Sequence, residues 1–313
     1  MAKFSVTEAA TAGFGIISRK PLAVVGWALA LIVGMVLPAL LCVLALGPEF
    51  VEMMKLAAEQ KGQGADPAAL QRIMALNSGL TGLNMLYWLW ATFVKSVFCA
   101  AVFRAVLTPE RSAWAYLRVS SREMWLALVL LVEQVLLGIA AFVLALVIGV
   151  IVAMAAVGGG EKNALAAAII TGSVGGAVAV VVVVWIALRL SMAGPMSFVD
   201  NQFRLFESWD LTRGQGWALL GVALLTVVFV LVVEMVIGGV VVGLIAAGGG
   251  TLAAMHGQAG LEAVFNQPPA QLLRQIWPWL TLLGLFGAVF GAVVQAVFYA
   301  PWAFIYRSLT RAG

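Results

Sequence analysis

The sequence predicts an all-α integral membrane protein with six transmembrane helices in three hairpins, each preceded by a cytoplasmic, interfacial amphipathic helix. Three observations support this fold class. Of the 313 residues, 63% are hydrophobic and only 10% are charged, whereas a soluble domain carries roughly 25% charged residues. Six apolar stretches are each long enough to cross a bilayer, which takes about 20 residues. Short segments rich in aromatic residues and arginine precede the first, third and fifth stretches.

The six predicted spans pair along the chain with short or moderate connections between them. The third, fourth and fifth exceed the length that a bilayer requires, so we expect them to tilt or to extend beyond it. The spans cover residues 22–46, 83–107, 124–157, 164–192, 217–247 and 279–306.

The distribution of basic residues predicts the orientation of the spans. Of the 18 Lys and Arg residues, twelve lie in the terminal segments and at the connections between spans two and three and between spans four and five. Five lie in the other connections, and Lys95 lies inside a span. Because Lys and Arg accumulate in cytoplasmic loops, both termini are predicted to be cytoplasmic.

The predicted interfacial segments have apolar and polar sides. In the first, Val6, Ala10 and Phe14 fall on one helical face. In the second, Thr108 and Pro109 are typical of a helix start, because a capping hydroxyl precedes a proline in the first turn. The third spans residues 206–213. Aromatic rings opposite basic residues are typical of helices that lie in the membrane interface. The candidate lipid contacts are Arg111, Trp114, Arg118, Arg204 and Trp209, and the rings of Tyr116 and Phe206 are expected to insert beside them.

Two of these segments end in a predicted capping box directly before a span. Ser120 is followed three residues later by Glu123, and Thr212 by Gln215. In a capping box the two side chains satisfy free backbone N–H groups at the helix start. The recurrence indicates one integral membrane domain, residues 1–313, with internal repeats over 1–107, 108–195 and 196–313.

Charged side chains inside the predicted spans define the candidate polar site. Lys95 lies about 13 Å from the inner end of its span, and Glu133 about 16 Å from the inner end of the next. We therefore expect Lys95 and Glu133 to pair. Intramembrane charges are rare and functional by default. The pair could hold two helices together, or it could form a buried substrate or proton site; both interpretations stay open here.

No pattern typical of an enzyme is present in the sequence. His256 is the single histidine and lies in a loop, and no P-loop or nucleophile elbow can be identified. We expect no catalytic residues, no metal site and no cofactor.

Several segments at the predicted inner side carry a family resemblance: Arg104-Ala-Val-Leu-Thr-Pro-Glu and Tyr116-Leu-Arg, then residues 189–195, 206–217 and 300–307. Here the chain resembles a broad bacterial family of six-span inner-membrane proteins. It is similar to the membrane domain fused to some glycerophosphoryl diester phosphodiesterases and to stand-alone relatives of unknown function. The quoted residues belong to the membrane part alone, so the resemblance implies a membrane module and not the phosphodiesterase activity.

Two functional hypotheses follow. The first is a non-enzymatic module of the bacterial inner membrane that binds lipids, or another membrane protein, through the interfacial segments; nucleic acid is not an expected partner. The alternative is a transporter or permease for a small or lipidic solute, with Lys95 and Glu133 along its path.

Overall fold

The computed structural model describes residues 4–42, 67–109, 113–247 and 269–311, together with residues 45, 46, 49, 52 and 56. Every regular element in these ranges is a helix, which confirms the all-α fold class. The π-helix is η1 and the 3-10 helix is η2. In chain order the elements are α1 (Val6–Arg19), α2 (Pro21–Leu31), η1 (Ile32–Val36), α4 (Pro67–Leu107), η2 (Ala113–Tyr116), α5 (Ser121–Gly158), α6 (Gly160–Leu190), α7 (Ala193–Asp200), α8 (Glu207–Leu211), α9 (Gly216–Ala247) and α12 (Pro269–Arg311).

Six helices in the described ranges are long and apolar enough to cross a membrane, and each overlaps one predicted span. A multi-pass membrane protein is therefore the class of protein that this fold defines. The six stretches are Pro21–Cys42, Gln71–Leu107, Ser121–Gly158, Asn163–Asp200, Gly216–Gly243 and Thr281–Thr310.

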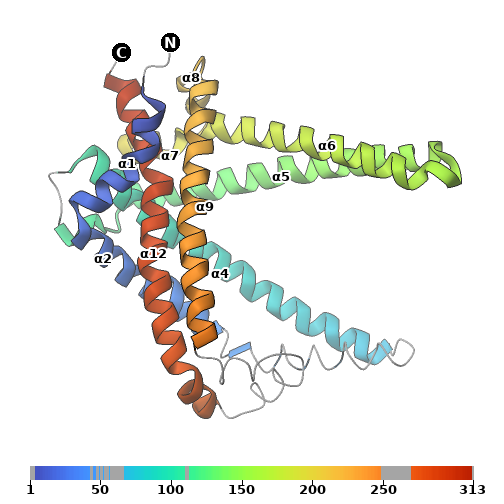
Figure 1. Ribbon diagram of the computed structural model, residues 1–313, viewed down its shortest axis with the longest axis horizontal. Coiled ribbons are helices and arrows are strands. Elements are labelled where there is room, and N and C mark those ends of the chain that lie inside the picture. Colours follow the sequence, from blue (N-terminus) through green and yellow to red (C-terminus); the bar gives the residue numbers. More distant parts are fainter. Residues whose placement is uncertain are drawn as a thin grey trace.

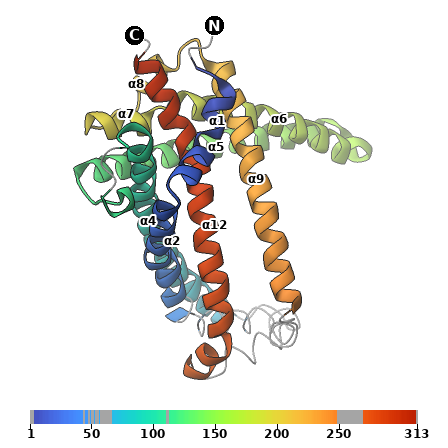
Figure 2. The ribbon, with the colours of Figure 1, turned by 60° about the vertical axis from the view of Figure 1, so that its left-hand side comes forward.

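Helix α12 is the central element of the fold and packs against α1, α2, α4, α7 and α9 (Figures 1 and 2). Small residues allow helix backbones to approach closely in a membrane. A stripe of buried alanines spaced three or four apart occupies one side of α12: Ala288, Ala292, Ala296, Ala300 and Ala303. Both chain termini lie at the same end of α12, near α1 and α8 (Figure 1).

Helix α1 packs inside this assembly instead of lying on the membrane surface alone. Its N-cap, Ser5, accepts a hydrogen bond from the Glu8 backbone N–H, and its buried side contacts α12 and α9. Gly13 lies directly against the α12 backbone, because an added Cβ would lie 2.5 Å from the Cα of Val297. The predicted apolar face is therefore real, but protein covers much of it; Phe14 stacks edge-on against Phe229 of α9.

The first span contains a π-helix that leads into Pro38. Proline has no N–H, so it cannot bond the carbonyl four residues earlier, which belongs to Gly34. The Trp90 indole of α4 donates to that carbonyl at 2.7 Å. Because a backbone group without a partner is costly in lipid, this bond replaces the missing partner and joins the first two spans.

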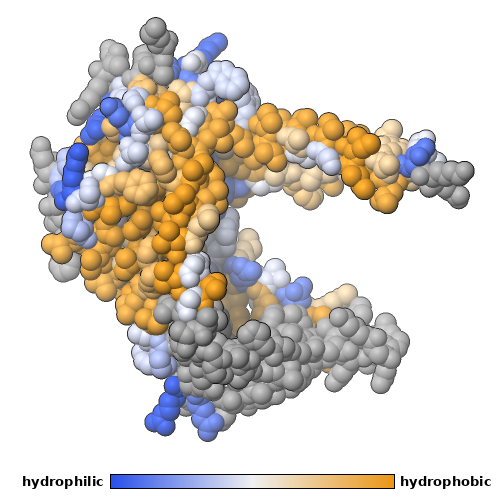
Figure 3. All heavy atoms as spheres, in the orientation of Figure 1, coloured by the Kyte–Doolittle hydropathy of each residue, from blue (hydrophilic) through white to orange (hydrophobic). Residues whose placement is uncertain are grey.

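Helices α5 and α6 form a hairpin that projects to one side of the other helices (Figure 1). The buried residues of α5 are Glu123, Leu126 and Val129, all near its start, and those of α6 are Leu188 and Leu190 at its end. Beyond this base, the face of the hairpin that Figure 3 shows is mostly apolar, with hydrophilic residues near its tip. Such a surface suits lipid as its solvent. Among the described residues, the buried side chains of the hairpin all lie at its base.

Candidate functional site

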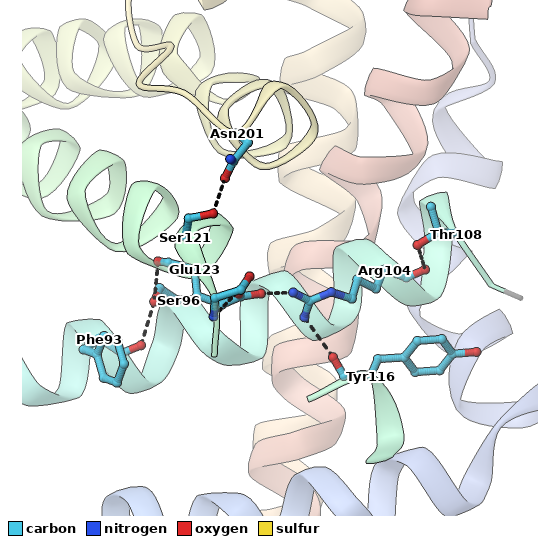
Figure 4. A network of polar contacts seen from close by, with 9 residues as sticks. Phe93, Ser96, Arg104, Thr108, Tyr116, Ser121, Glu123 and Asn201 are labelled. Atoms are coloured by element: carbon cyan, nitrogen blue, oxygen red, sulfur yellow. Dashed lines mark hydrogen bonds and ion pairs between the residues drawn. The ribbon is translucent and has the colours of Figure 1, made fainter. Parts of the chain in front are cut away.

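A buried ion pair between Arg104 of α4 and Glu123 of α5 lies at the base of the α5–α6 hairpin (Figure 4). The Arg104 side chain is 7% exposed and that of Glu123 is fully buried. A buried ion pair needs further hydrogen bonds to offset the cost of removing two charges from water. Here the second Arg104 nitrogen donates to the Tyr116 carbonyl at 2.9 Å. The pair therefore fixes α4, α5 and η2 to one another.

The start of α5 explains how Glu123 reaches this position. The Ser120–Glu123 capping box is present, which confirms that prediction. One carboxylate oxygen accepts from the Ser120 backbone N–H at 2.8 Å and from its hydroxyl, while the other oxygen faces Arg104. The Ser96 hydroxyl of α4 donates to the Glu123 carbonyl at 3.3 Å. Glu123 thus caps a helix and binds a cation at the same time.

The second predicted capping box, at Thr212 and Gln215, is wrong. Helix α9 begins at Gly216, and the Thr212 hydroxyl donates to the Ser208 carbonyl at 2.9 Å, within the turn that ends α8. The Gln215 side-chain oxygen is buried without a hydrogen bond among the described residues. The Thr212 carbonyl has another role, since Arg189 donates to it at 3.0 Å.

The predicted amphipathic helix that begins at Thr108 is also wrong. Thr108 instead closes α4, because its N–H donates to the Arg104 carbonyl at 2.9 Å. Among the described residues that follow, 113–120 contain only the short η2, in which Ala115 and Tyr116 adopt left-handed backbone angles that cannot continue a helix. The Tyr116 ring is 1% exposed, so it is buried and does not insert into headgroups.

Tyr116 links the buried ion pair to α1. Its hydroxyl receives a hydrogen bond from the Lys20 ammonium group and donates to the Pro109 carbonyl at 3.0 Å. The Trp27 indole of α2 donates to the neighbouring Ala115 carbonyl at 2.7 Å. These contacts connect the first predicted repeat to the second.

Helix α7 completes the site from the other side. The rings of Phe198 and Phe103 stack edge-on, and the guanidinium groups of Arg104 and Arg122 lie over Phe198 at 5.3 and 5.7 Å from its centre. The Ser121 hydroxyl and the Asn201 side-chain oxygen are 2.9 Å apart, at the end of α7 (Figure 4). The site therefore contains contributions from α4, η2, α5 and α7.

The other two arginines at the inner ends of the even-numbered spans make related contacts. Arg189 lies between the rings of Trp185 and Trp209, at 5.6 and 5.8 Å, and Arg307 donates to the Val106 carbonyl at 3.0 Å. Each of the three arginines thus bonds a backbone carbonyl of another segment. The internal repeats stay a prediction.

The structure places four of the five predicted lipid contacts; Arg111 lies outside the described residues. Trp114 is part of η2, and Arg118 is exposed just after it. Trp209 is 36% exposed and packs edge-on against Trp185. Neighbouring Phe206 is 68% exposed.

Arg204 is partly neutralised. It forms ion pairs with Asp200 at 3.3 Å and with Glu207 at 3.1 Å, and its side chain is 37% exposed. A backbone hydrogen bond and then the Arg204 side chain lower the pKa of Glu207. Glu207 therefore balances part of the positive charge of Arg204 in this segment.

Lys95 and Glu133 do not form the predicted ion pair; among the described side chains, neither has a partner of opposite charge within 4.0 Å. The reason is the register of α4 and α5. Ser96, next to Lys95, contacts Glu123, so Lys95 lies near the start of α5 and about ten residues, or 15 Å, short of Glu133. Whether either group acts in function stays a prediction.

The structure adds two contacts that reasoning from the sequence missed, the Arg104–Glu123 pair and the Trp90–Gly34 bond. The first had a signal: both residues lie at the same predicted end of adjacent spans.

In the described ranges, no three His, Cys, Asp or Glu residues come together in a way that would hold a metal ion. No family model, curated protein or solved structure matches this chain.

Proposed function

We propose that this chain is a non-enzymatic membrane module that binds acidic lipid headgroups through the basic helix ends beside its termini. The observation that carries the proposal is the surface around α7, α8 and the start of α5. Arg118 is exposed just before α5, and Arg204 lies in the same segment as the exposed rings of Phe206 and Trp209. Such rings favour the headgroup level, and basic side chains there attract anionic lipid.

The location follows the same reasoning. We place the protein in the bacterial inner membrane with both termini in the cytoplasm, in line with the family that it resembles. The excess of Lys and Arg at this end supports the orientation, because anionic lipids of the cytoplasmic leaflet attract such residues. Both termini also lie at this end of α12 (Figure 1).

Mass spectrometry of the protein extracted in native lipid nanodiscs tests the proposal. We expect anionic lipid to be enriched relative to the surrounding membrane. In a variant with Arg118→Gln and Arg204→Gln, the loss of Arg118 should reduce this enrichment about fivefold, from about 1 kcal/mol. The loss of Arg204 should add less, because Asp200 and Glu207 partly neutralise its charge. The control is Arg72→Gln, since Arg72 is exposed in an ion pair with Glu52 on the other side of the membrane in the predicted topology.

Two outcomes would contradict the proposal. Equal lipid ratios in the nanodisc and in the bulk membrane would remove the evidence for headgroup binding. A stoichiometric protein partner without lipid enrichment would favour a partner-binding module, and an enriched solute would favour the transporter.

A further inference from the structure

A cavity of about 340 Å³ lies between α1, the end of α4 and the end of α12. Its polar lining contains Arg19, Lys20 and Arg307, and Glu8 is the one acidic residue among the described residues that line it. The remaining wall is largely apolar and includes Phe304. At roughly 30 Å³ for each water molecule, the cavity has room for about ten.

We propose that this cavity binds a phosphate group, carried either by a lipid headgroup or by a small soluble molecule. The inference rests on the proposed function and deepens it, because it assigns a discrete site within the basic end of the protein. It uses different side chains from the surface around α7 and α8.

The positions of two of the three cations are set by neutral partners. The Lys20 ammonium group donates to the Tyr116 hydroxyl and, at 3.3 Å, to the Pro109 carbonyl. Arg307 donates to the Val106 carbonyl at 3.0 Å and lies 5.5 Å from the centre of the Phe304 ring. These bonds hold both side chains at the wall of the cavity.

The third cation is available to a ligand. Arg19 lies in the last turn of α1, is exposed, and has no hydrogen bond or ion pair among the described residues. The Glu8 carboxylate likewise has no ion pair within that part of the chain. Among the described residues that line the cavity, three are cationic and one is acidic, so positive charge predominates there.

The chemistry of these groups favours phosphate over a carboxylate. Arginine presents planar, paired donors that match phosphate oxygens, and lysine adds a compact charge. Two arginines and a lysine from α1 and α12 can contact several oxygens of one phosphate group from different directions. The apolar wall beside them suits the first carbon atoms attached to the phosphate.

The test uses the full chain in a phosphate-free maltoside detergent and follows thermal unfolding. The probes are sodium phosphate, with sodium chloride at matched ionic strength, and short-chain phosphatidic acid. We expect at least one probe to raise the melting temperature in a saturable way, since a ligand that binds only the folded state stabilises it.

Arg19→Gln is the diagnostic variant, because it removes no hydrogen bond or ion pair within the described part of the chain. We expect its Kd for the effective probe to be at least tenfold weaker, as the loss of one charge-assisted hydrogen bond implies. Arg213→Gln, an exposed arginine outside the cavity, is the matched control and should bind like the wild type.

The probes distinguish the source of the phosphate. A response to both supports a site for the phosphate group itself, and a response to phosphatidic acid alone supports a lipid headgroup site. No saturable response to either, or an unchanged Kd in Arg19→Gln, would overturn the cavity proposal. If that happens while nanodisc enrichment still depends on Arg118 and Arg204, headgroup binding survives. If lipid enrichment is absent but the cavity binds a probe, the proposed function is contradicted and the cavity proposal stands.

Discussion

The guanidinium group of Arg104 and the carboxylate of Glu123 meet at the junction of α4 and α5, where both are almost fully removed from solvent. Among the described residues, the buried side chains of the α5–α6 hairpin lie near its base, and this pair is one of the contacts there that hold it to the fold. The same carboxylate also completes the cap of α5. One side chain therefore controls both where α5 starts and what it is attached to.

We expect Arg104→Gln or Glu123→Gln alone to lower the free energy of unfolding by about 3–5 kcal/mol, because each leaves a buried charge unpaired. The double variant should cost less than the sum of the two. Reversible unfolding in mixed micelles measures these values. The exposed Arg204–Glu207 pair is the control and should contribute about 0–1 kcal/mol. Strictly additive effects of the two substitutions would show that the pair is not coupled.

Replacement of Trp90 by phenylalanine should remove the bond to the Gly34 carbonyl while keeping an aromatic ring in the same place. Pro38 has no N–H to donate to that carbonyl, so we expect the substitution to lower the free energy of unfolding by about 1–2 kcal/mol. Trp125→Phe is the matched control, because Trp125 is 37% exposed and has no hydrogen bond from its indole among the described contacts. Equal stability of the two variants would mean that the indole bond contributes nothing.

Gly13→Ala should weaken the attachment of α1 to α12. The new methyl group would lie 2.5 Å from the Val297 Cα and 2.7 Å from the Ala296 carbonyl oxygen, and both are backbone atoms. We expect a cost of about 1–3 kcal/mol from overpacking. Gly15 is two residues further along α1, with nothing within 4 Å of an added Cβ. Gly15→Ala should therefore be neutral or stabilising by up to about 1 kcal/mol, from helix propensity. If thermal unfolding gives both variants the same stability, α1 does not pack as described.

A cysteine at position 95 should stay unreactive towards membrane-impermeant thiol reagents, because we expect no aqueous path through the helices. The background protein carries alanine at Cys42 and Cys99, and Ser5→Cys, at the exposed start of α1, is the reactive control. Labelling at position 95 that a candidate solute blocks would instead favour the transporter hypothesis.

The six spans could be predicted from the sequence because the length and apolarity of each depend on local residues alone. The Ser120–Glu123 box was predictable for the same reason, since its partners are three residues apart. The Thr212 box failed because the Thr212 hydroxyl donates to the Ser208 carbonyl in the turn that ends α8, four residues earlier in the chain.

The Lys95–Glu133 prediction was wrong because the sequence alone does not show how neighbouring helices align. The prediction assumed that adjacent spans begin at the same depth. The contact between Ser96 and Glu123 instead places Lys95 beside the start of α5 and away from Glu133. Helix crossing and register depend on side-chain packing between segments, which hydropathy does not describe. The bond between Trp90 and Gly34 was out of reach for the same reason: Pro38 indicates a free carbonyl, but not which helix supplies the donor.

The measurement we would make first compares thermal stability in nanodiscs of zwitterionic lipid with that in nanodiscs containing about a third anionic lipid, at low and high salt. If the basic end of the protein binds acidic headgroups, anionic lipid should raise the melting temperature, and salt should reduce the gain because it screens exposed charges. The Arg118→Gln, Arg204→Gln variant should show a smaller gain. Identical melting temperatures in the two lipid mixtures at low salt would contradict headgroup binding.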